Sequence, residues 1–341
     1  MDQKQDFIVI GWGLAGANLI WHLHQRGCKI TVYDMGKNHS SRLAAGIVNP
    51  IVFKRLTKSW QADTLLPYAF NFYKEIEKKT GEIFYHAEKI ARIFASIEEQ
   101  NNWAALEGDE RFDSYIEKIE MLKSEHINAP YGVGKVQAAR LEVNRFLDAS
   151  KKFLGNQGVT FVNHPFGFKQ VEHRSQYVFC EGYHLRDNIF FPHIPMKETH
   201  GETLTIRSTT LNISDILNKN MFVLPLGDNL YKIGATYNWE MKTAETTEAG
   251  KKELLEKFNS ITNVPFEIVQ HQAGIRPTVS DRRPLLGTHP VKKNLHLFNG
   301  LGTKGVMIAP YYAQLMVDYL LKNTPLPAEV DIKRYEKHYN P

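Results

Sequence analysis

The fold is decided by the stretch Phe7-Ile8-Val9-Ile10-Gly11-Trp12-Gly13-Leu14-Ala15-Gly16. Its four apolar residues predict a buried strand, and the spacing G-x-G-x-x-G predicts a tight turn into a helix that continues to about Arg26. A second apolar strand, residues 29–33, ends on the acid Asp34. This order of strand, glycine turn, helix, strand and acid is typical of a dinucleotide-binding βαβ unit.

Each glycine of this turn has a physical task. Gly11 permits the sharp turn out of the strand, Gly13 lets the backbone approach a pyrophosphate, and Gly16 lets helix and strand pack closely. The pyrophosphate would lie on free N–H groups at the positive end of the helix dipole. Asp34 is placed to accept hydrogen bonds from an adenosine ribose. The stretch therefore predicts a bound adenine dinucleotide and leaves open which one.

The composition is that of a soluble globular protein. The 341 residues are enough for one large or two ordinary domains, and 43% of them are hydrophobic. The net charge of +5 is mild and spread along the chain, which argues against nucleic-acid binding by electrostatics alone. Cys28 and Cys180 belong to no CxxC motif, so we expect two buried thiols in a reducing, cytoplasmic compartment rather than a disulfide. No apolar segment of the sequence reaches the roughly 18–20 residues of a membrane span.

The rest of the chain alternates between helical and strand-like patterns. Apolar spacing predicts helices over residues 62–79, 98–106, 111–121, 141–155, 247–258 and 306–321. Short apolar runs predict strands within residues 82–96, 159–162, 177–180, 202–206, 221–226, 231–235 and 295–298.

A second glycine-rich turn follows the last of these strands. It reads Asn299-Gly300-Leu301-Gly302-Thr303-Lys304-Gly305 and leads into the last predicted helix. Its free N–H groups can face an anionic or electron-rich ligand atom. Because one glycine turn suffices for a pyrophosphate, the second one suggests a cofactor with another electron-accepting part, such as a flavin.

Two stretches near the start of the chain each allow two interpretations. The small residues in 40–46 suggest backbone running close to the far half of the cofactor, or an ordinary surface loop. The basic cluster of Lys54, Arg55 and Lys58 can attract an anionic substrate, although such clusters are more often only solvated. The 14 histidines include no metal-ligand spacing, so no metal is expected.

The chain resembles the FAD-dependent D-amino-acid oxidase family, with glycine oxidase and sarcosine-oxidase-like enzymes as the nearest relatives. The resemblance covers nearly the whole chain and rests on four stretches: 7–16, 40–46, 273–287 with Gly274-Ile275-Arg276-Pro277, and 300–310. The first stretch alone is shared with many flavin and nicotinamide enzymes, whereas all four in this order are much more specific.

The resemblance implies an α/β fold in which a Rossmann-like FAD-binding domain is interleaved with an α+β substrate domain built on a mixed or antiparallel sheet. The sheet of the substrate domain would cover the isoalloxazine ring. We expect the FAD-binding domain to comprise residues 1–54, 131–192 and 271–341, and the substrate domain to comprise residues 55–130 and 193–270.

The resemblance also implies which residues contact FAD. The FAD would be non-covalent, because no cysteine lies in or beside the matched flavin motifs. The expected contacts are Gly11, Gly13, Leu14, Ala15, Gly16 and Asp34 to the ADP half, Phe168 to the adenine, and Ser41, Arg42, Ala45, Gly46, Ile47, Gly300, Gly302, Thr303, Lys304 and Gly305 to the flavin half.

Arg276 is the residue that we expect to bind substrate. In the family the arginine of G-x-R-P forks onto the substrate carboxylate, which suits a planar guanidinium. The alternative is a structural pair with Asp281 or a neighbouring acid. Tyr237 would line the substrate pocket, or pack in the core. Phe222 stands where the family often has a carboxylate-binding tyrosine, and Thr303 where glycine oxidase has a second arginine, so the substrate need not be glycine.

The implied reaction is oxidation of an amino acid or secondary amine that bears a carboxylate, by hydride transfer to flavin N5. Oxygen or a quinone-linked acceptor would reoxidise the flavin. One alternative is the oxidase-type domain of a bifunctional tRNA-modifying enzyme, in which Lys54, Arg55 and Lys58 would touch nucleic acid. Another is a non-catalytic dinucleotide-binding flavoprotein.

Overall fold

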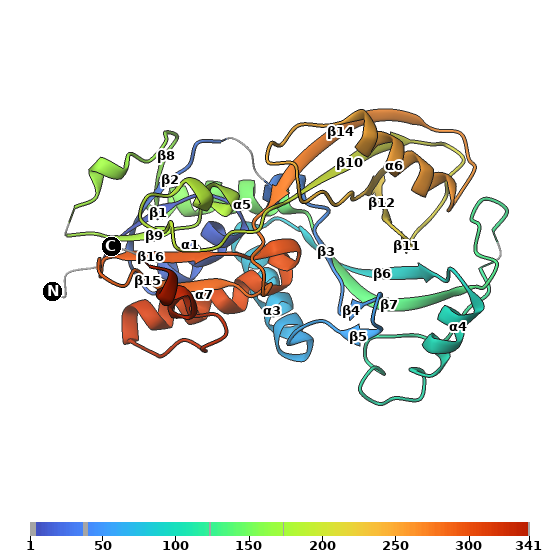
Figure 1. Cartoon of the computed structure of the whole chain (residues 1–341), viewed down its shortest axis with the longest axis horizontal. Coiled ribbons are helices and arrows are strands. Elements are labelled where there is room, and N and C mark those ends of the chain that lie inside the picture. Colours follow the sequence, from blue (N-terminus) through green and yellow to red (C-terminus); the bar gives the residue numbers. More distant parts are fainter. Residues whose placement is uncertain (1–4, 37–39, 123, 173, 340–341) are drawn as a thin grey trace.

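The computed structural model describes residues 5–36, 40–122, 124–172 and 174–339, which form two halves, each built on one large sheet (Figure 1). The stretch around the first glycine turn lies at the centre of the six-stranded sheet. There β1 (Asp6–Ile10) pairs in parallel with β2 (Lys29–Tyr33) on one side and with β9 (Gln176–Phe179) on the other. The predicted Rossmann-like βαβ unit is therefore confirmed.

Three more strands complete this sheet in the order β15-β16-β9-β1-β2-β8. Two of them are parallel to the centre, and β15 is antiparallel at one edge. Because the parallel strands end at the same edge, the segments that follow β1, β2, β9 and β16 meet there. The added strands are β8 (Thr160–Val162), β15 (Leu285–Thr288) and β16 (Leu295–Asn299).

Four helices share a hydrophobic core with this sheet. The sequence of α1 (Leu14–Gln25) is largely apolar, and its residues 14–23 are all buried, because α1 packs against both α7 and α5 as well as the sheet. The core shared by these elements includes Phe7, Trp21, Tyr73 and Phe146. The other three helices are α3 (Ala62–Thr80), α5 (Val143–Asn156) and α7 (Gly305–Lys322).

The second half is built on a mixed eight-stranded sheet. Its order is β14-β10-β13-β12-β11-β6-β7-β3, and of its pairings β11–β6 is parallel while the others are antiparallel. This confirms the predicted mixed sheet. The strands are β3 (Ile47–Val48), β6 (Tyr85–Ile93), β7 (Val133–Leu141), β10 (Thr199–Arg207), β11 (Ile216–Asn218), β12 (Phe222–Gly227), β13 (Leu230–Gly234) and β14 (Glu267–Arg276).

Smaller elements connect or cover the two sheets. Helices α4 (Ile97–Ala104) and α6 (Glu248–Asn259) belong to the half on the right of Figure 1. The others are α2 (Ser40–Leu43), the hairpin β4 (Ile51–Val52) and β5 (Thr57–Lys58), and the 3₁₀ helices η1 (Phe168–Gln170), η2 (Gly182–Asp187), η3 (Gly302–Lys304) and η4 (Ile332–His338).

The prediction of a helix over residues 111–121 is wrong. The spacing of Phe112 and Ile116 looks helical, and both side chains are buried, but the segment forms turns and isolated bridges alongside β7. Ile116 pairs with Val136, and Glu120 pairs with Val133. Burial against a strand therefore produced the same apolar spacing as a helix face.

The domain limits drawn from the sequence stay a prediction, but four segments lie differently from that assignment. β3, β7 and residues 271–276 of β14 fall within the ranges assigned to the FAD-binding domain, and they pair in the eight-stranded sheet. α3 falls within the range assigned to the substrate domain, and it packs against α7 and α5.

Two expectations from the composition concern cysteines and membranes. Cys28 and Cys180 are both free. Cys180 is buried as expected, whereas the prediction of a buried Cys28 is wrong, because Cys28 is only half-buried. Within the described ranges, no helix combines the length and the apolar character needed to cross a membrane.

The close packing of α1 on the glycine turn generates a testable prediction. A Cβ at Gly16 would lie 2.0 Å from the carbonyl oxygen of Gly11, so Gly16→Ala must push the helix away from the turn. We expect this variant to lower the free energy of unfolding by about 1–3 kcal/mol. Urea unfolding followed by circular dichroism measures the change.

Gly155→Ala is the matched control. Gly155 lies in α5, and nothing is within 4 Å of a Cβ placed there. Alanine should therefore raise the free energy of unfolding by up to about 1 kcal/mol, through its better helix propensity. Equal stability of the two variants would contradict this account of the glycine turn.

Candidate active site

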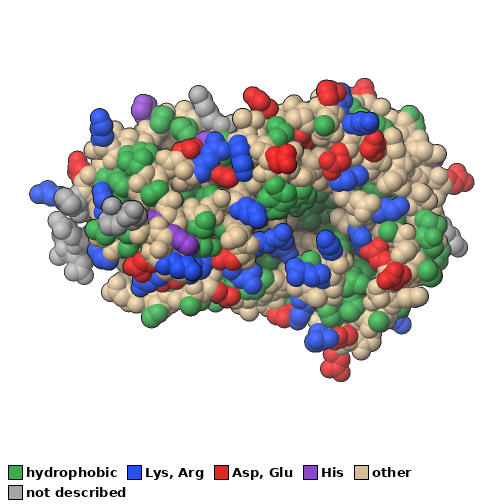
Figure 2. Space-filling view, viewed as in Figure 1, with side chains coloured by type: hydrophobic (Ala, Val, Ile, Leu, Met, Phe, Trp, Pro, Cys, Tyr) green, Lys and Arg blue, Asp and Glu red, His purple; other side chains and the backbone are tan. Residues whose placement is uncertain are grey.

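A cavity of about 910 Å³ lies at the carboxyl edge of the six-stranded sheet. Its wall takes residues from both glycine turns and from strands of the eight-stranded sheet, including β10, β12 and β14. Figure 2 shows the hollow near the middle of the molecule, with Lys and Arg side chains gathered around its mouth. Open α/β sheets bind ligands at this edge. The binding point is where the strand order reverses, which in this sheet is at β1.

The first glycine turn forms one end of the cavity. Gly11 has a φ of +108°, and a Cβ there would lie 2.4 Å from the carbonyl oxygen of Cys180, so glycine is required on two grounds. The Asp34 carboxylate accepts hydrogen bonds from the N–H of Trp12, at 3.2 Å, and of Gly36, at 3.2 Å. Asp34 therefore fastens the turn, in addition to the ribose contact expected of it.

The small-residue stretch 40–46 lies in the cavity wall rather than on an ordinary surface loop. The Ser41 hydroxyl accepts a hydrogen bond from Leu14 N at 3.1 Å, which links the stretch to the start of α1. The Ser40 hydroxyl donates to Ile275 O on β14. Gly46 has a φ of +72°, and a Cβ there would lie 1.9 Å from Leu141 O on β7. The stretch thus runs between the two sheets.

The second glycine turn forms another part of the wall, and its end at Gly305 lies close to Leu14 of the first turn. Leu301, Gly302, Thr303 and Gly305 line the cavity just before α7, and Gly302 N donates to Pro277 O at 3.2 Å. The start of this 18-residue helix therefore faces the cavity, as the sequence indicated.

The cavity brings together most of the residues expected to bind cofactor. Four of them lie outside its wall. Gly16 and Gly300 stand behind the two turns, where a Cβ would meet Gly11 O and the Leu285 side chain respectively. The Arg42 guanidinium points to α5, where it pairs with Asp148 at 2.7 Å. The Lys304 ammonium group donates to the Ser59 hydroxyl. The expected residues in the wall are Gly11, Gly13, Leu14, Ala15, Asp34, Ser41, Ala45, Gly46, Ile47, Phe168, Gly302, Thr303 and Gly305.

Arg276 ends β14 and lies in the cavity wall beside the second sheet. Its Nη1 and Nη2 donate to His200 O and Thr236 O, each at the long distance of 3.3 Å. The guanidinium lies 4.3 Å from the centre of the Tyr237 ring, and it packs so closely on Gly201 that a Cβ there would be 2.2 Å from Nη2. Burial lowers the pKa of Arg276 from its usual value.

The alternative pair between Arg276 and Asp281 is not formed in the structure. Asp281 is hydrogen-bonded to Arg334, at 2.9 Å, and to Tyr335, at 3.0 Å. Among the described residues, no carboxylate pairs with Arg276. Tyr237 is also not a core residue, because 58% of its surface is exposed and it lines the cavity.

The basic cluster divides in the structure. Lys54 is exposed and lines the cavity, and Arg55 is exposed beside it. Lys58 pairs with Asp63 and lies 5.7 Å from the Tyr115 ring centre. One member of the cluster therefore has access to a bound ligand.

Sequence reasoning missed four charged residues of the wall, which are Arg92, Glu181, Asp187 and Lys219. Arg92 pairs with Glu99 at 2.7 Å and lies 5.3 Å from the Phe53 ring centre, so its charge is already compensated. Glu181 lies two residues after the end of β9, and the rule that ligand-binding residues follow parallel strands could have indicated it.

Comparison with known proteins agrees with this geometry. The family model described as FAD dependent oxidoreductase (DAO) matches residues 6–319. The chain is 25% identical to the bifunctional protein ThiO/ThiG of Trichormus variabilis over 98% of its own length and 55% of that protein. It is 23% identical to glycine oxidase of Bacillus licheniformis over 95% of both chains.

A third relative is the tRNA 5-methylaminomethyl-2-thiouridine biosynthesis bifunctional protein MnmC of Campylobacter jejuni subsp. doylei. It is 24% identical over 82% of this chain and 45% of that protein. The chain thus spans about half the length of each bifunctional relative.

Solved structures share the fold. The glycine oxidases of Geobacillus kaustophilus and Bacillus cereus have TM-scores of 0.79 and 0.77, each at 18% identity. They cover 97% and 94% of this chain, and this chain covers 98% and 96% of theirs. At this identity the likeness shows the fold alone.

Lys304 generates a prediction about stability and pH. Burial, with the nearby charge of Arg55, lowers the pKa of Lys304 to about 8, below the ordinary pKa of about 10.4. Between these values the unfolded chain holds a proton that the folded chain has released, so this residue's contribution to stability rises with pH. The wild type should therefore gain stability relative to Lys304→Met as the pH rises. The difference between their free energies of unfolding should increase by on the order of 3 kcal/mol between about pH 8 and 10.

Urea unfolding of the flavin-free chain at several pH values measures this difference. Lys78→Met is the control, because Lys78 is exposed on α3 and should show no such rise. Parallel pH profiles for the wild type and Lys304→Met would show that the lysine is not desolvated in solution.

Proposed function

Because the chain belongs to the DAO family of FAD-dependent oxidoreductases, we propose that it oxidises a small amine that bears a carboxylate. The substrate would be an amino acid or a secondary amine, and hydride would pass from its carbon to flavin N5. The observation that carries the proposal is Arg276, a half-buried guanidinium in the cavity wall without an acidic partner among the described residues.

The residues of the wall fit FAD. Backbone without side chains lines the cavity at Gly11, Gly13, Gly302 and Gly305, and the two long helices that start there direct their positive ends towards it. When bound, the flavin supplies the electron acceptor of the reaction. The protein supplies orientation and electrostatics.

Arg276 is held in place by hydrogen bonds that leave some of its N–H donors free. A guanidinium has five N–H donors, and the bonds to His200 O and Thr236 O take two of them. The Tyr237 ring and the Gly201 backbone pack against the guanidinium and limit its rotation. The remaining donors can therefore fork onto a carboxylate without much further ordering of the side chain.

The wall around Arg276 excludes water in part. Phe222 of β12, Ile90 of β6 and Phe53 line the same cavity with apolar surface. A charge pair in such surroundings is stronger than in water.

We assign no general base, because an amine that binds neutral needs none. Oxygen or a quinone-linked compound would accept the electrons. Two free cysteines and no membrane-crossing helix among the described residues agree with a cytoplasmic location.

A second candidate substrate is a modified uridine in tRNA. The likeness to MnmC favours it, as does the position of Lys54 in the cavity wall with Arg55 beside it. A carboxymethylaminomethyl group on such a uridine is itself a secondary amine that bears a carboxylate. The same contact with Arg276 would then hold the nucleoside side chain, while the lysine and arginine would meet phosphates.

Anaerobic mixing with a panel of D-, L- and N-methyl amino acids tests the main proposal. Bleaching of the flavin by one of them identifies the substrate, and bleaching by none would leave a non-catalytic flavoprotein or the tRNA candidate.

The role of Arg276 generates the next prediction. Arg276→Leu should raise KM for the carboxylate substrate at least about a hundredfold, roughly 3 kcal/mol, because a charge-assisted fork is lost. The flavin content, read from the absorbance spectrum, should stay unchanged. Arg276→Lys should lie between the two, since it keeps the charge and loses the fork.

Arg283→Leu is the matched control. Arg283 stacks on Trp60, 4.3 Å from the ring centre, and does not line the cavity. Its loss should leave KM unchanged. Normal substrate kinetics in Arg276→Leu would remove Arg276 from the site.

The tRNA candidate predicts binding that depends on salt. The double variant Lys54→Gln/Arg55→Gln should reduce the slope of log K against log salt by about 1–2, because each lost phosphate contact removes about one. Lys58→Gln should change it little, since Lys58 is paired with Asp63. If bulk tRNA is not retained even at low ionic strength, this candidate fails.

A further inference from the structure

Glu181 stands beside the first glycine turn. β9 pairs with β1 so that Phe179 lies opposite Ile10, and Cys180 N donates to Ile10 O at 2.7 Å. A Cβ at Gly11 would be only 3.5 Å from Glu181 N. Glu181 is thus the second residue beyond the end of β9, and it lines the half of the cavity where a pyrophosphate would lie on the turn.

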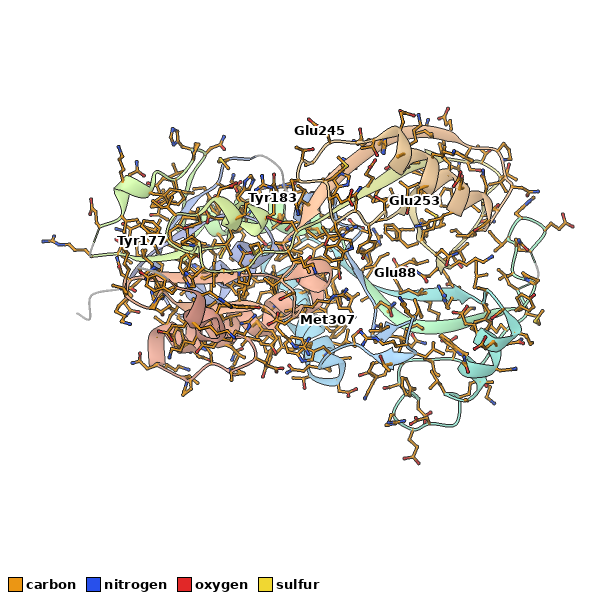
Figure 3. All side chains as sticks on the ribbon, in the orientation of Figure 1. Glu88, Tyr177, Tyr183, Glu245, Glu253 and Met307 are labelled. Carbon is orange, nitrogen blue, oxygen red and sulfur yellow. The ribbon has the colours of Figure 1, made fainter. Side chains whose placement is uncertain are left out.

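A neighbouring segment positions the Glu181 side chain. Its Oε2 accepts a hydrogen bond of 2.6 Å from Nδ2 of Asn188, a residue that is 2% exposed. The Asn188 amide is itself oriented, because its Oδ1 accepts from Phe190 N at 2.8 Å. Asn188 follows η2, whose Tyr183 lies near the junction of the two halves in Figure 3.

The charged and titratable groups around Glu181 offer it no compensating cation. From η2, Tyr183, His184 and Asp187 line the same cavity, and across the glycine turn Asp34 does so as well. The thiol of the preceding residue, Cys180, is neutral, since burial raises the pKa of this thiol well above its usual value. Among the described residues no Lys or Arg is paired with Glu181. Burial and the charge of Asp187 raise the pKa of Glu181 to about 7.

An ionised carboxylate in this position would oppose cofactor binding. The pyrophosphate of FAD is an anion, and two like charges in a partly buried wall repel each other. A neutral carboxylic acid has no such cost, and it has a proton to donate to a phosphate or sugar oxygen. The wall therefore favours the protonated form of Glu181 once FAD is present.

We propose that Glu181 enters the FAD site as a carboxylic acid and donates a hydrogen bond to an oxygen of the sugar–phosphate chain of FAD. Wherever Glu181 is ionised in the flavin-free chain, binding of FAD takes up one proton. By linkage, the affinity for FAD is then full at mildly acidic pH and falls as the pH rises above neutral, by up to about tenfold for each pH unit.

Histidines offer a competing source of the same trend. His164 and His184 line this half of the cavity, and protonated imidazoles would also favour an anion at low pH. The two explanations differ in which substitution removes the pH dependence.

The experiment measures FAD release from the full-length holoprotein. Dilution series at pH 6, 7, 8 and 9 are followed by the rise in FAD fluorescence, which gives Kd at each pH without any substrate. In the wild type we expect Kd to rise several-fold to tenfold per pH unit above about pH 7. In Glu181→Gln, which keeps a donor and cannot ionise, we expect a Kd that does not change with pH. His184→Gln, the matched control, should keep the wild-type slope.

Each outcome either supports or overturns the proposed role of Glu181. A wild-type Kd that is flat from pH 6 to 9, or a slope that survives in Glu181→Gln, overturns the proposal, and a slope lost only in His184→Gln assigns it to the histidine. Glu181→Leu guards against a glutamine variant that does not fold. It should also bind without pH dependence, but roughly three- to tenfold more weakly than Glu181→Gln because the donor is gone.

This inference concerns cofactor binding and does not depend on the proposed substrate. Flavin bleaching by an amine tests the reaction, whereas FAD release tests Glu181, so either can fail while the other holds.

Discussion

The structure depends on one steric constraint, the absence of side chains where β1, β9 and α1 meet. At Gly11 and Gly16 an added Cβ would lie 2.4 Å from Cys180 O and 2.0 Å from Gly11 O. Because the backbones touch there, the start of α1 lies directly over the strand ends and its N–H groups face the cavity. The position of Asp34, which bonds to Trp12 N, and of Glu181, next to Gly11, follows from the same contact.

Local sequence patterns predicted most of the fold, because they reflect interactions between residues that are close together in the chain. The Rossmann unit, the second glycine turn and α7 were predicted correctly, because glycine spacing and long apolar helices act within one segment. The pattern failed at 111–121, where Phe112 and Ile116 are buried by β7 rather than by helix packing. The pairing of β7 with β6 and β3 was also missed, because strand neighbours are set by the whole fold.

The site could be predicted well where a motif implied that the backbone lies against the cavity. It was predicted less well where a motif implied the position of a side chain. Glycine and small-residue positions such as Gly13 and Gly46 lie in the wall as expected. Arg42 and Lys304 belong to matched motifs, but their side chains pair with Asp148 and Ser59 instead. Glu181 has no motif of its own, and its importance comes from which strands are neighbours in space.

The wide separation of the two glycine turns has a consequence for biosynthesis. β16, which lies between β15 and β9, and the turn that follows it come from residues 295–305, near the end of the described chain. During translation the six-stranded sheet cannot close, and the cofactor cavity has no second wall, until these residues leave the ribosome. FAD therefore cannot stabilise the nascent chain early. The residues before β16 must therefore remain unaggregated without the closed cofactor site.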